Sequence, residues 1–219
     1  MRNTDMSDPS DSWVIMFDEK YKGLTTCILS DFISIVMKYQ GNDGDFVAYD
    51  GKPEEAKAAI TKAQDLLIAH KDMVRKYYDA GSEVQQMLIN EDAYVAQAWS
   101  GPAAKLIMDG HPVELSVPKE GTYGFLYSFN VVKNAPNADA AYAFLDALLA
   151  VSADAGAAMT RASGFSSALA GVGEKLDDRE RAALALPEEQ IERITFFFSI
   201  NRDMKNELID SAVTAIKAS

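Results

Sequence analysis

Short β-prone runs alternate with helical patterns in the first half of the chain. Residues 24–29 and 76–78 predict strands, and residues 93–99 predict a buried strand. Ser30 and Asp31 are expected to cap a helix that runs to about residue 40. Residues 53–71 give the clearest helix, with proline at its first position, and residues 82–90 predict a shorter one. This alternation indicates an α/β layered fold.

The second half continues the alternation with longer helical segments. Helices are predicted over residues 101–110, 138–160 with a break near Ser152, 177–186, 188–193 and 201–219, and strands over 113–117, 123–132 and 195–198. Residues 164–173 show no regular pattern. We find no internal repeat, so one large domain or two small lobes fit the length.

Charge excludes two classes of partner. The 219 residues include 21 Lys and Arg against 33 Asp and Glu, a formal charge of −12. A phosphate backbone or an anionic membrane would be repelled, so no nucleic acid partner is expected. An acidic surface is compatible with a cationic ligand, although it also keeps many proteins from associating.

Residues with catalytic or metal-binding chemistry are few. Cys27 lies in an apolar run without a basic neighbour, which favours an inert core thiol. His70 and His111 lack the spacing of a metal site, and no phosphate-binding loop, nucleophile elbow or HExxH motif occurs. We therefore predict no cofactor and no metal. An α/β enzyme that uses Asp31 and Tyr127 is the least favoured alternative, because no nucleophile and base pair can be recognised.

The N-terminus has no apolar segment typical of a secretory leader, and no stretch reaches the length of a membrane span. The chain as written is therefore expected not to be exported.

Aromatic and polar residues stand where predicted strands end, which is where open α/β sheets bind ligands. The candidate ligand-binding residues are Asp31, Trp99, Phe125, Tyr127, Phe165 and Ser199. Each has a structural alternative: Asp31 as a favourable charge at a helix N-terminus, Trp99 and Phe125 as core side chains, and Tyr127 as an amphipathic rim residue.

Two motifs carry a resemblance to a known family. Residues 94–101, Tyr-Val-Ala-Gln-Ala-Trp-Ser-Gly, are followed by residues 116–121, Ser-Val-Pro-Lys-Glu-Gly. This combination resembles the spermidine and putrescine periplasmic binding proteins of ABC importers. Residues 3–5, 12–13, 138–149 and 215–218 are similar to further segments of that family.

The resemblance implies a type II periplasmic-binding-protein fold, in which two α/β lobes clamp a solute between them. Residues 1–12 would be an inter-lobe crossover, 13–121 the second lobe, 122–173 a return segment of the first lobe, and 174–219 C-terminal helices returning to the second lobe. The opening part of the first lobe would be missing.

The resemblance also assigns roles to the candidate residues. Asp31 matches an acid that binds a ligand amine, and Trp99 matches a tryptophan on which polyamine methylenes pack. Pro102 replaces an aspartate of the putrescine type, and residues 125–127, Phe-Leu-Tyr, replace a Trp-x-Asp of the spermidine type. Phe165 stands where the family usually has a tyrosine, and Ser199 stands where the spermidine type has a glutamine. With one carboxylate left, a monoamine, an amino-acid-like solute or another small organic cation fits better than a polyamine.

The sequence therefore predicts a truncated, non-enzymatic solute-binding protein of an ABC importer. Its partners would be a small solute and an ABC permease, and the resemblance implies a periplasmic location. The rival interpretation is a stand-alone oligomerising or regulatory domain. Because residues 123–132 and 140–149 would lose their packing partners, we also expect a homo-oligomer, either a dimer or an aggregate.

Overall fold

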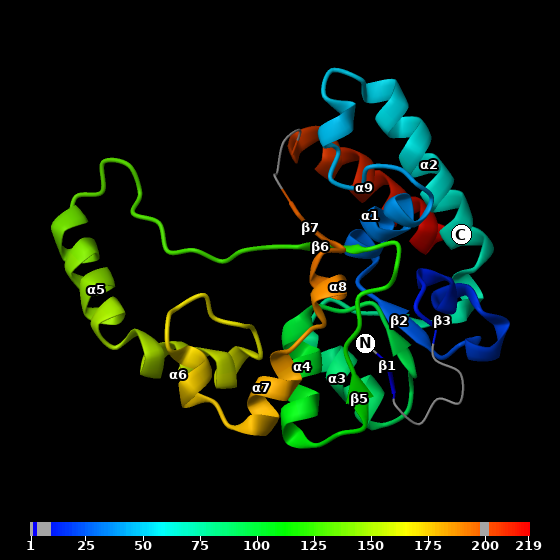
Figure 1. Cartoon of the computed structure of the whole chain (residues 1–219). Helices are drawn as coiled ribbons and strands as arrows, with labels where there is room; N and C mark the ends of the chain where they lie inside the picture. Colours follow the sequence, from blue (N-terminus) through cyan, green and yellow to red (C-terminus); the bar gives the residue numbers. More distant parts are fainter. Residues whose placement is uncertain (1, 4–9, 198–201) are drawn as a thin grey trace.

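The core of the protein is a five-stranded sheet in the order β3-β2-β4-β1-β5 (Figure 1). The computed structural model describes residues 2–3, 10–197 and 202–219. Strand β2 is parallel to both β3 and β4, whereas β1 is antiparallel to β4 and β5. The strands are β1 (Arg2–Asn3), β2 (Thr25–Cys27), β3 (Val74–Tyr77), β4 (Val95–Ala96) and β5 (Val113–Glu114).

Helices cover both faces of this sheet because side chains alternate along each strand. Cys27 and Val95 join one apolar core, whereas the next residues, Ile28 and Ala96, join a second core. The first core contains α1 (Leu29–Tyr39), α2 (Pro53–Ala69) and α9 (Arg202–Ala218), and the second contains α3 (Gly81–Ile89) and α4 (Ser100–Asp109). This is the α/β layered fold that the sequence predicts.

Short 3-10 helices fill the connections at the start of the chain and around α2. They are η1 (Trp13–Phe17), η2 (Glu19–Tyr21), η3 (Val47–Tyr49) and η4 (Lys71–Met73). The indole Nε1 of Trp13 donates to the Gly121 carbonyl oxygen at 2.9 Å. This bond ties η1 to the turn before β6.

A second, two-stranded sheet holds the base of a long excursion. Strands β6 (Thr122–Gly124) and β7 (Ile194–Phe196) are parallel, although some seventy residues separate them. The excursion contains α5 (Ala138–Ala150), α6 (Ser152–Ser163), η5 (Val172–Lys175), α7 (Asp178–Leu184) and α8 (Glu188–Ile191). Helices α6 and α7 pack on α4, so this part of the excursion returns to the main body.

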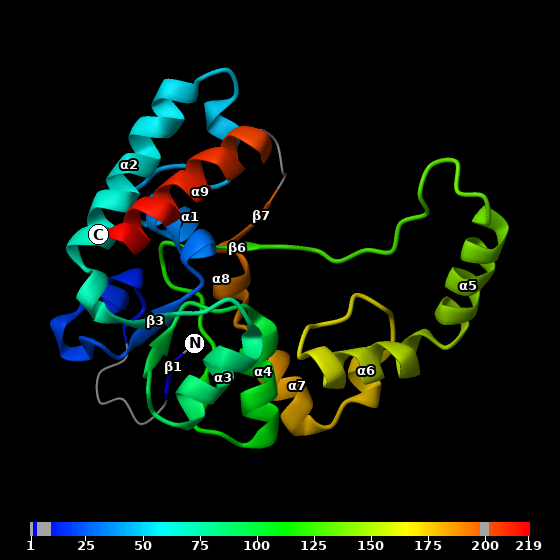
Figure 2. The ribbon, with the colours of Figure 1, turned by 180° about the vertical axis from the view of Figure 1, so that it is seen from behind.

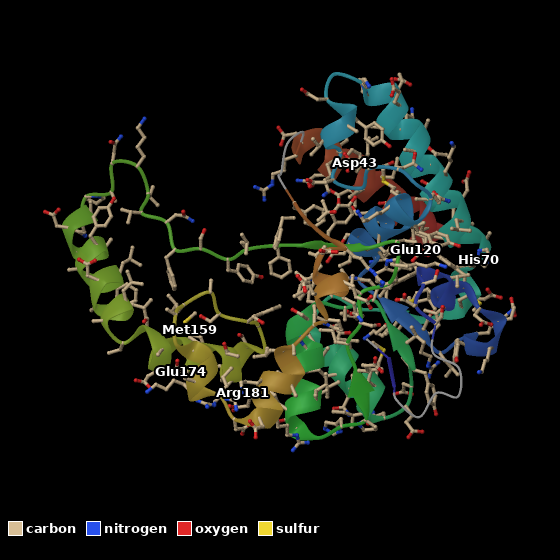
Figure 3. The ribbon with its side chains drawn as sticks, in the orientation of Figure 1. Asp43, His70, Glu120, Met159, Glu174 and Arg181 are labelled. Atoms are coloured by element: carbon tan, nitrogen blue, oxygen red, sulfur yellow. The ribbon has the colours of Figure 1, made fainter. Side chains whose placement is uncertain are left out.

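Residues 125–151, here called the arm, project away from the rest of the protein in both ribbon views (Figures 1 and 2). No residue of α5 is buried. Side chains of the arm extend into open space (Figure 3). The exposed apolar residues of the arm include Leu126, Tyr127, Phe129, Val132, Tyr142, Phe144, Leu149 and Val151.

The structure corrects several element boundaries, and the strands predicted over 24–29 and 113–117 shorten to Thr25–Cys27 and Val113–Glu114. Of the strand predicted over residues 123–132, only Thr122–Gly124 is a strand, because the described chain offers no neighbour that could pair with the rest. The strand predicted over 93–99 shortens to Val95–Ala96. Asp31 lies in the first turn of α1 instead of at its cap, because the helix already begins at Leu29.

Within the described residues, no single helix is long and apolar enough to cross a membrane. The consecutive helices α5 and α6 reach that length and composition only together, and they are bent by 89° at Val151. This bend agrees with the break predicted near Ser152.

Candidate functional site

Asp31 and Trp99 meet at the carboxyl edge of the main sheet. Strands β2 and β4 are parallel neighbours, so the helices that follow them, α1 and α4, start side by side. Trp99 occupies the cap position of α4, and its Nε1 donates to Oδ2 of Asp31 at 2.9 Å. Parallel topology therefore joins two candidate residues that lie 68 positions apart in the sequence.

Gln97 braces the same edge. Its Oε1 accepts the Ile28 backbone N–H at 3.0 Å, and its carbonyl oxygen accepts the buried Tyr78 hydroxyl at 2.8 Å. Both bonds are buried, so the ends of β2 and β4 are held in a fixed relation. The Asp31 and Trp99 pair is thus carried by rigid backbone.

Burial is the largest influence on the Asp31 carboxyl, and it raises the pKa of that group above its ordinary value. The hydrogen bond from Trp99, the charge of Lys205 and a hydrogen bond from Ser30 act in the opposite direction and lower the pKa. The carboxylate consequently sits where a further cation would gain from pairing with it.

Trp99 belongs to a group of four aromatic side chains, here called the aromatic cluster: Trp99, Phe125, Tyr127 and Phe165. The Phe125 ring centroid lies 6.4 Å from Trp99, 5.0 Å from Tyr127 and 5.7 Å from Phe165. The Tyr127 and Phe165 centroids are 6.0 Å apart. The interplanar angles range from 68° to 79°, which are favourable edge-to-face arrangements.

Two glycines place Phe165 in the cluster. Gly164 has a φ of +74° and ends α6 in the left-handed region, and a Cβ there would lie 2.1 Å from the Gly101 carbonyl oxygen. A Cβ on Gly101 would in turn lie 2.9 Å from Cζ of Phe165. The start of α4 and the end of α6 can touch only because both positions lack a side chain.

The cluster forms one wall and is open on its other side. Phe125 is 37% exposed and Tyr127 is 79% exposed, whereas Asp31, Trp99 and Phe165 are partly buried. The structure thus brings five of the six candidate residues together, and the sixth, Ser199, lies outside the described residues. A hollow of about 330 Å³ lies elsewhere, between the end of α6 and α7.

Sequence reasoning missed a cationic neighbour of this wall. Lys205, in the first turns of α9, lies within electrostatic range of Asp31 and pairs with Asp45. On an amphipathic helix a lysine is usually a solvated side chain, so the pattern gave no sign that Lys205 turns inward. The pair Asp43 and Asp45 in a turn was the one available signal.

Metal chemistry finds no support in the described part of the chain, which contains no group of three or more His, Cys, Asp or Glu side chains that could hold a metal ion. Cys27 is fully buried, and burial raises the pKa of its thiol. That setting fits the inert core thiol predicted from sequence.

Comparison with known proteins gives the family. The chain matches bacterial extracellular solute-binding proteins over residues 1–184. It is 31% identical over 156 residues to the putrescine-binding periplasmic protein PotF of Escherichia coli, an alignment that covers 64% of this chain and 39% of PotF.

Two solved structures share the fold. A protein of Listeria monocytogenes described as a spermidine/putrescine ABC transporter superposes with a TM-score of 0.75 at 18% identity, over 97% of this chain and 65% of that one. PotD, the spermidine/putrescine substrate-binding protein of Streptococcus pneumoniae, gives 0.73 at 15% identity, over 99% of this chain and 64% of that one.

The chain therefore spans 39% of the length of its curated relative and about two thirds of these solved structures. The predicted type II periplasmic-binding-protein fold and the spermidine and putrescine resemblance are both confirmed. The relatives are solute-binding proteins and not enzymes, which confirms the prediction of a non-catalytic chain. On this evidence the chain belongs to the family of bacterial extracellular solute-binding proteins.

Proposed function

We propose that this chain binds a small organic cation for an ABC importer, using Asp31 and the aromatic cluster as the ligand-binding wall. The observation that carries the proposal is the 2.9 Å hydrogen bond from Trp99 Nε1 to Asp31 Oδ2, at the edge of four edge-to-face rings. A carboxylate beside aromatic faces supplies charge pairing and cation–π attraction to an ammonium group.

The ligand class follows from the number of carboxylates in the wall. Asp31 is the one acid among the candidate residues, and Pro102 and Tyr127 stand where polyamine-binding relatives are expected to carry acids. Burying a second ammonium group without an anionic partner costs several kcal/mol. A monoamine or an amino-acid-like solute therefore fits this wall better than putrescine or spermidine.

Transport is part of the same proposal. The family's two-lobe architecture would close around the solute by a hinge and present it to a membrane permease outside the cytoplasm. Residues 1–12 would serve as a crossover, 13–121 as the second lobe, 122–173 as a return segment of the first lobe, and 174–219 as C-terminal helices that return to the second lobe.

The binding wall can be tested with the chain as it stands. The two tryptophans, Trp13 and Trp99, give separate indole N–H signals in a ¹H–¹⁵N NMR spectrum, and the Trp13 donor to Gly121 serves as an internal control. Titration with n-butylamine should shift the Trp99 signal saturably, with a dissociation constant on the order of 1 mM or weaker because one wall leaves half the ligand in water. The Trp13 signal should stay in place.

A matched pair of charge-neutralising variants decides the assignment. Asp31→Asn should abolish the saturable shift, whereas Asp65→Asn, at an exposed position on α2, should leave it intact. Equal binding by both variants would show that the shift of the Trp99 signal comes from the overall negative charge of the protein, and that Asp31 is not part of the binding site.

A second candidate function rests on the arm. Its exposed apolar side chains, including Leu126, Phe129 and Phe144, suit a domain that assembles with other copies of itself. Light scattering decides between the two: a stable monomer at high concentration that does not bind a hydrophobic dye would rule out the oligomerising domain.

A further inference from the structure

Lys205 sits in a setting that suits a bound amine. Its Nζ lies 3.8 Å from the centroid of the Phe197 ring and 3.3 Å from Oδ1 of Asp45. The Lys205 side chain is 15% exposed and the Asp45 side chain 3%. An aromatic face on one side and a buried carboxylate on the other are the groups that recognise a primary ammonium ion. We call Phe197 and Asp45 the ammonium subsite.

The subsite is held rigidly around the lysine. The Phe197 ring stacks on Tyr123 with centroids 4.6 Å apart and planes inclined by 12°. The Tyr123 hydroxyl accepts the Gly44 backbone N–H at 2.8 Å, next to Asp45. The Asp43 carboxylate accepts the Asp45 backbone N–H at 2.9 Å, which fixes the turn that carries the acid. The ring and the carboxylate therefore keep their positions independently of the lysine.

The ammonium subsite adjoins the proposed binding wall. In the β6 and β7 pair Gly124 lies opposite Phe196, so Phe125 and Phe197 leave the two strands at the same edge. The Phe197 backbone N–H donates to the Gly124 carbonyl oxygen at 3.1 Å. Lys205 also interacts electrostatically with Asp31, at the other end of the wall. The start of α9 lies at this edge in both ribbon views (Figures 1 and 2).

We propose that Lys205 is an internal occupant of this ammonium subsite, and that it restricts the ligand of the neighbouring wall to a single positive charge. The proposal has two parts, and only the second, the restriction of ligand charge, rests on the proposed function. The first part, that Phe197 and Asp45 form a site for a primary amine that Lys205 fills, stands on the geometry of the subsite alone. Lys205 is thus a specificity-determining residue that repels a second ammonium group.

Neighbouring charges fit this role. Desolvation lowers the pKa of Lys205, and the carboxylates of Asp45, Asp31 and Asp43 counter that effect. Their excess negative charge would attract a diamine if the lysine were absent. With Lys205 in place, the second ammonium group of a diamine meets a like charge and an occupied ring face.

Chemical rescue tests the subsite without reference to the wall. Lys205→Ala removes the ammonium group that pairs with the buried Asp45 carboxylate, so the melting temperature of this variant should fall well below that of the wild type. Ethylamine should raise the melting temperature of this variant by several degrees and leave the wild type and the Lys205→Ala/Asp45→Asn double variant nearly unchanged. If Lys205→Ala is unfolded in plain buffer, ethylamine should restore its helical circular dichroism signal. Absence of rescue overturns the proposal.

Selectivity tests the second part. On the Trp99 indole signal, the dissociation constant of putrescine relative to that of n-butylamine should fall at least tenfold in Lys205→Ala. Lys38→Ala is the matched control, because Lys38 lies 5.1 Å from the Tyr123 centroid and its loss changes net charge equally without opening the subsite. An equal change in both variants overturns the selectivity role. Wild-type protein that binds neither amine at Trp99 refutes the proposed function instead, and the rescue result still decides the subsite.

Discussion

The contact between Gly101 and Gly164 can be isolated by one substitution and its control. Gly164 combines a φ of +74° with a position where a Cβ would lie 2.1 Å from the Gly101 carbonyl oxygen. Gly23 has nearly the same φ, +71°, and no atom within 4 Å of its would-be Cβ. Gly164→Ala therefore tests backbone strain plus the contact, and Gly23→Ala tests the strain alone.

The expected magnitudes separate the two effects. An alanine in the left-handed region costs about 1–2 kcal/mol of folding free energy at either position. Gly164→Ala must also push α6 away from α4, and overpacking of this kind costs about 1–3 kcal/mol more. The carbonyl oxygen belongs to the backbone and cannot rotate away, so no small side-chain adjustment relieves the clash. We expect Gly164→Ala to be less stable than Gly23→Ala by about 1–3 kcal/mol.

Urea denaturation followed by circular dichroism measures this difference, and the Trp99 indole resonance reports the position of Phe165. Gly164→Ala should shift that resonance, because displacement of Phe165 changes the ring current around the aromatic cluster. Gly23→Ala should leave it in place. Equal denaturation midpoints for the two variants, together with an unmoved Trp99 signal, would refute the close-contact argument.

Three further predictions follow from burial and exposure. Burial raises the pKa of Asp31, so its charged form destabilises the fold at pH values above that raised pKa. At pH values below the ordinary pKa of about 3.9 the carboxyl is neutral in both the folded and the unfolded state, and the effect is absent. Asp31→Asn should therefore melt higher than the wild type at pH 7.5, with the gain vanishing below about pH 4, and a gain that persists at low pH would argue against a charge effect. Cys27, which is fully buried, should react with an aromatic disulfide reagent only in denaturant, and reaction in the native state would contradict its burial. Replacing Leu126 and Phe144 by serine should reduce self-association in light scattering without lowering the melting temperature, because both side chains are exposed.

The sequence was sufficient where local pattern and topology determine contacts. Parallel strands place their following helices at one edge, so the meeting of Asp31 and Trp99 could be expected from the alternation of strands and helices alone. Proline and acids at its start defined α2, which runs from Pro53 to Ala69 as expected.

The remainder depends on partners distant in the chain. Residues 125–132 have strand propensity, yet a strand forms only where another strand supplies hydrogen bonds, and β7 reaches no further than Phe196. The inward turn of Lys205 depends on the rotation of α9 against the turn that holds Asp45, which periodicity does not encode. The neighbours of Phe165 could not be predicted, because the loop around it has no regular pattern and its position depends on the contact between α6 and α4.

The packing of α9 has a consequence for how the chain folds. Ile209, Ala212 and Ile216 are buried in the same core as α1 and α2, although the whole of the excursion separates them from these helices in the sequence. Contacts of such sequence separation form slowly, because the closure of a long loop precedes any gain from burial. A ribosome-bound chain that ends before Arg202 must hold the apolar faces of α1 and α2 in water. This core is therefore completed only after α9 has been synthesised, and until then the chain stays open to chaperones and proteases.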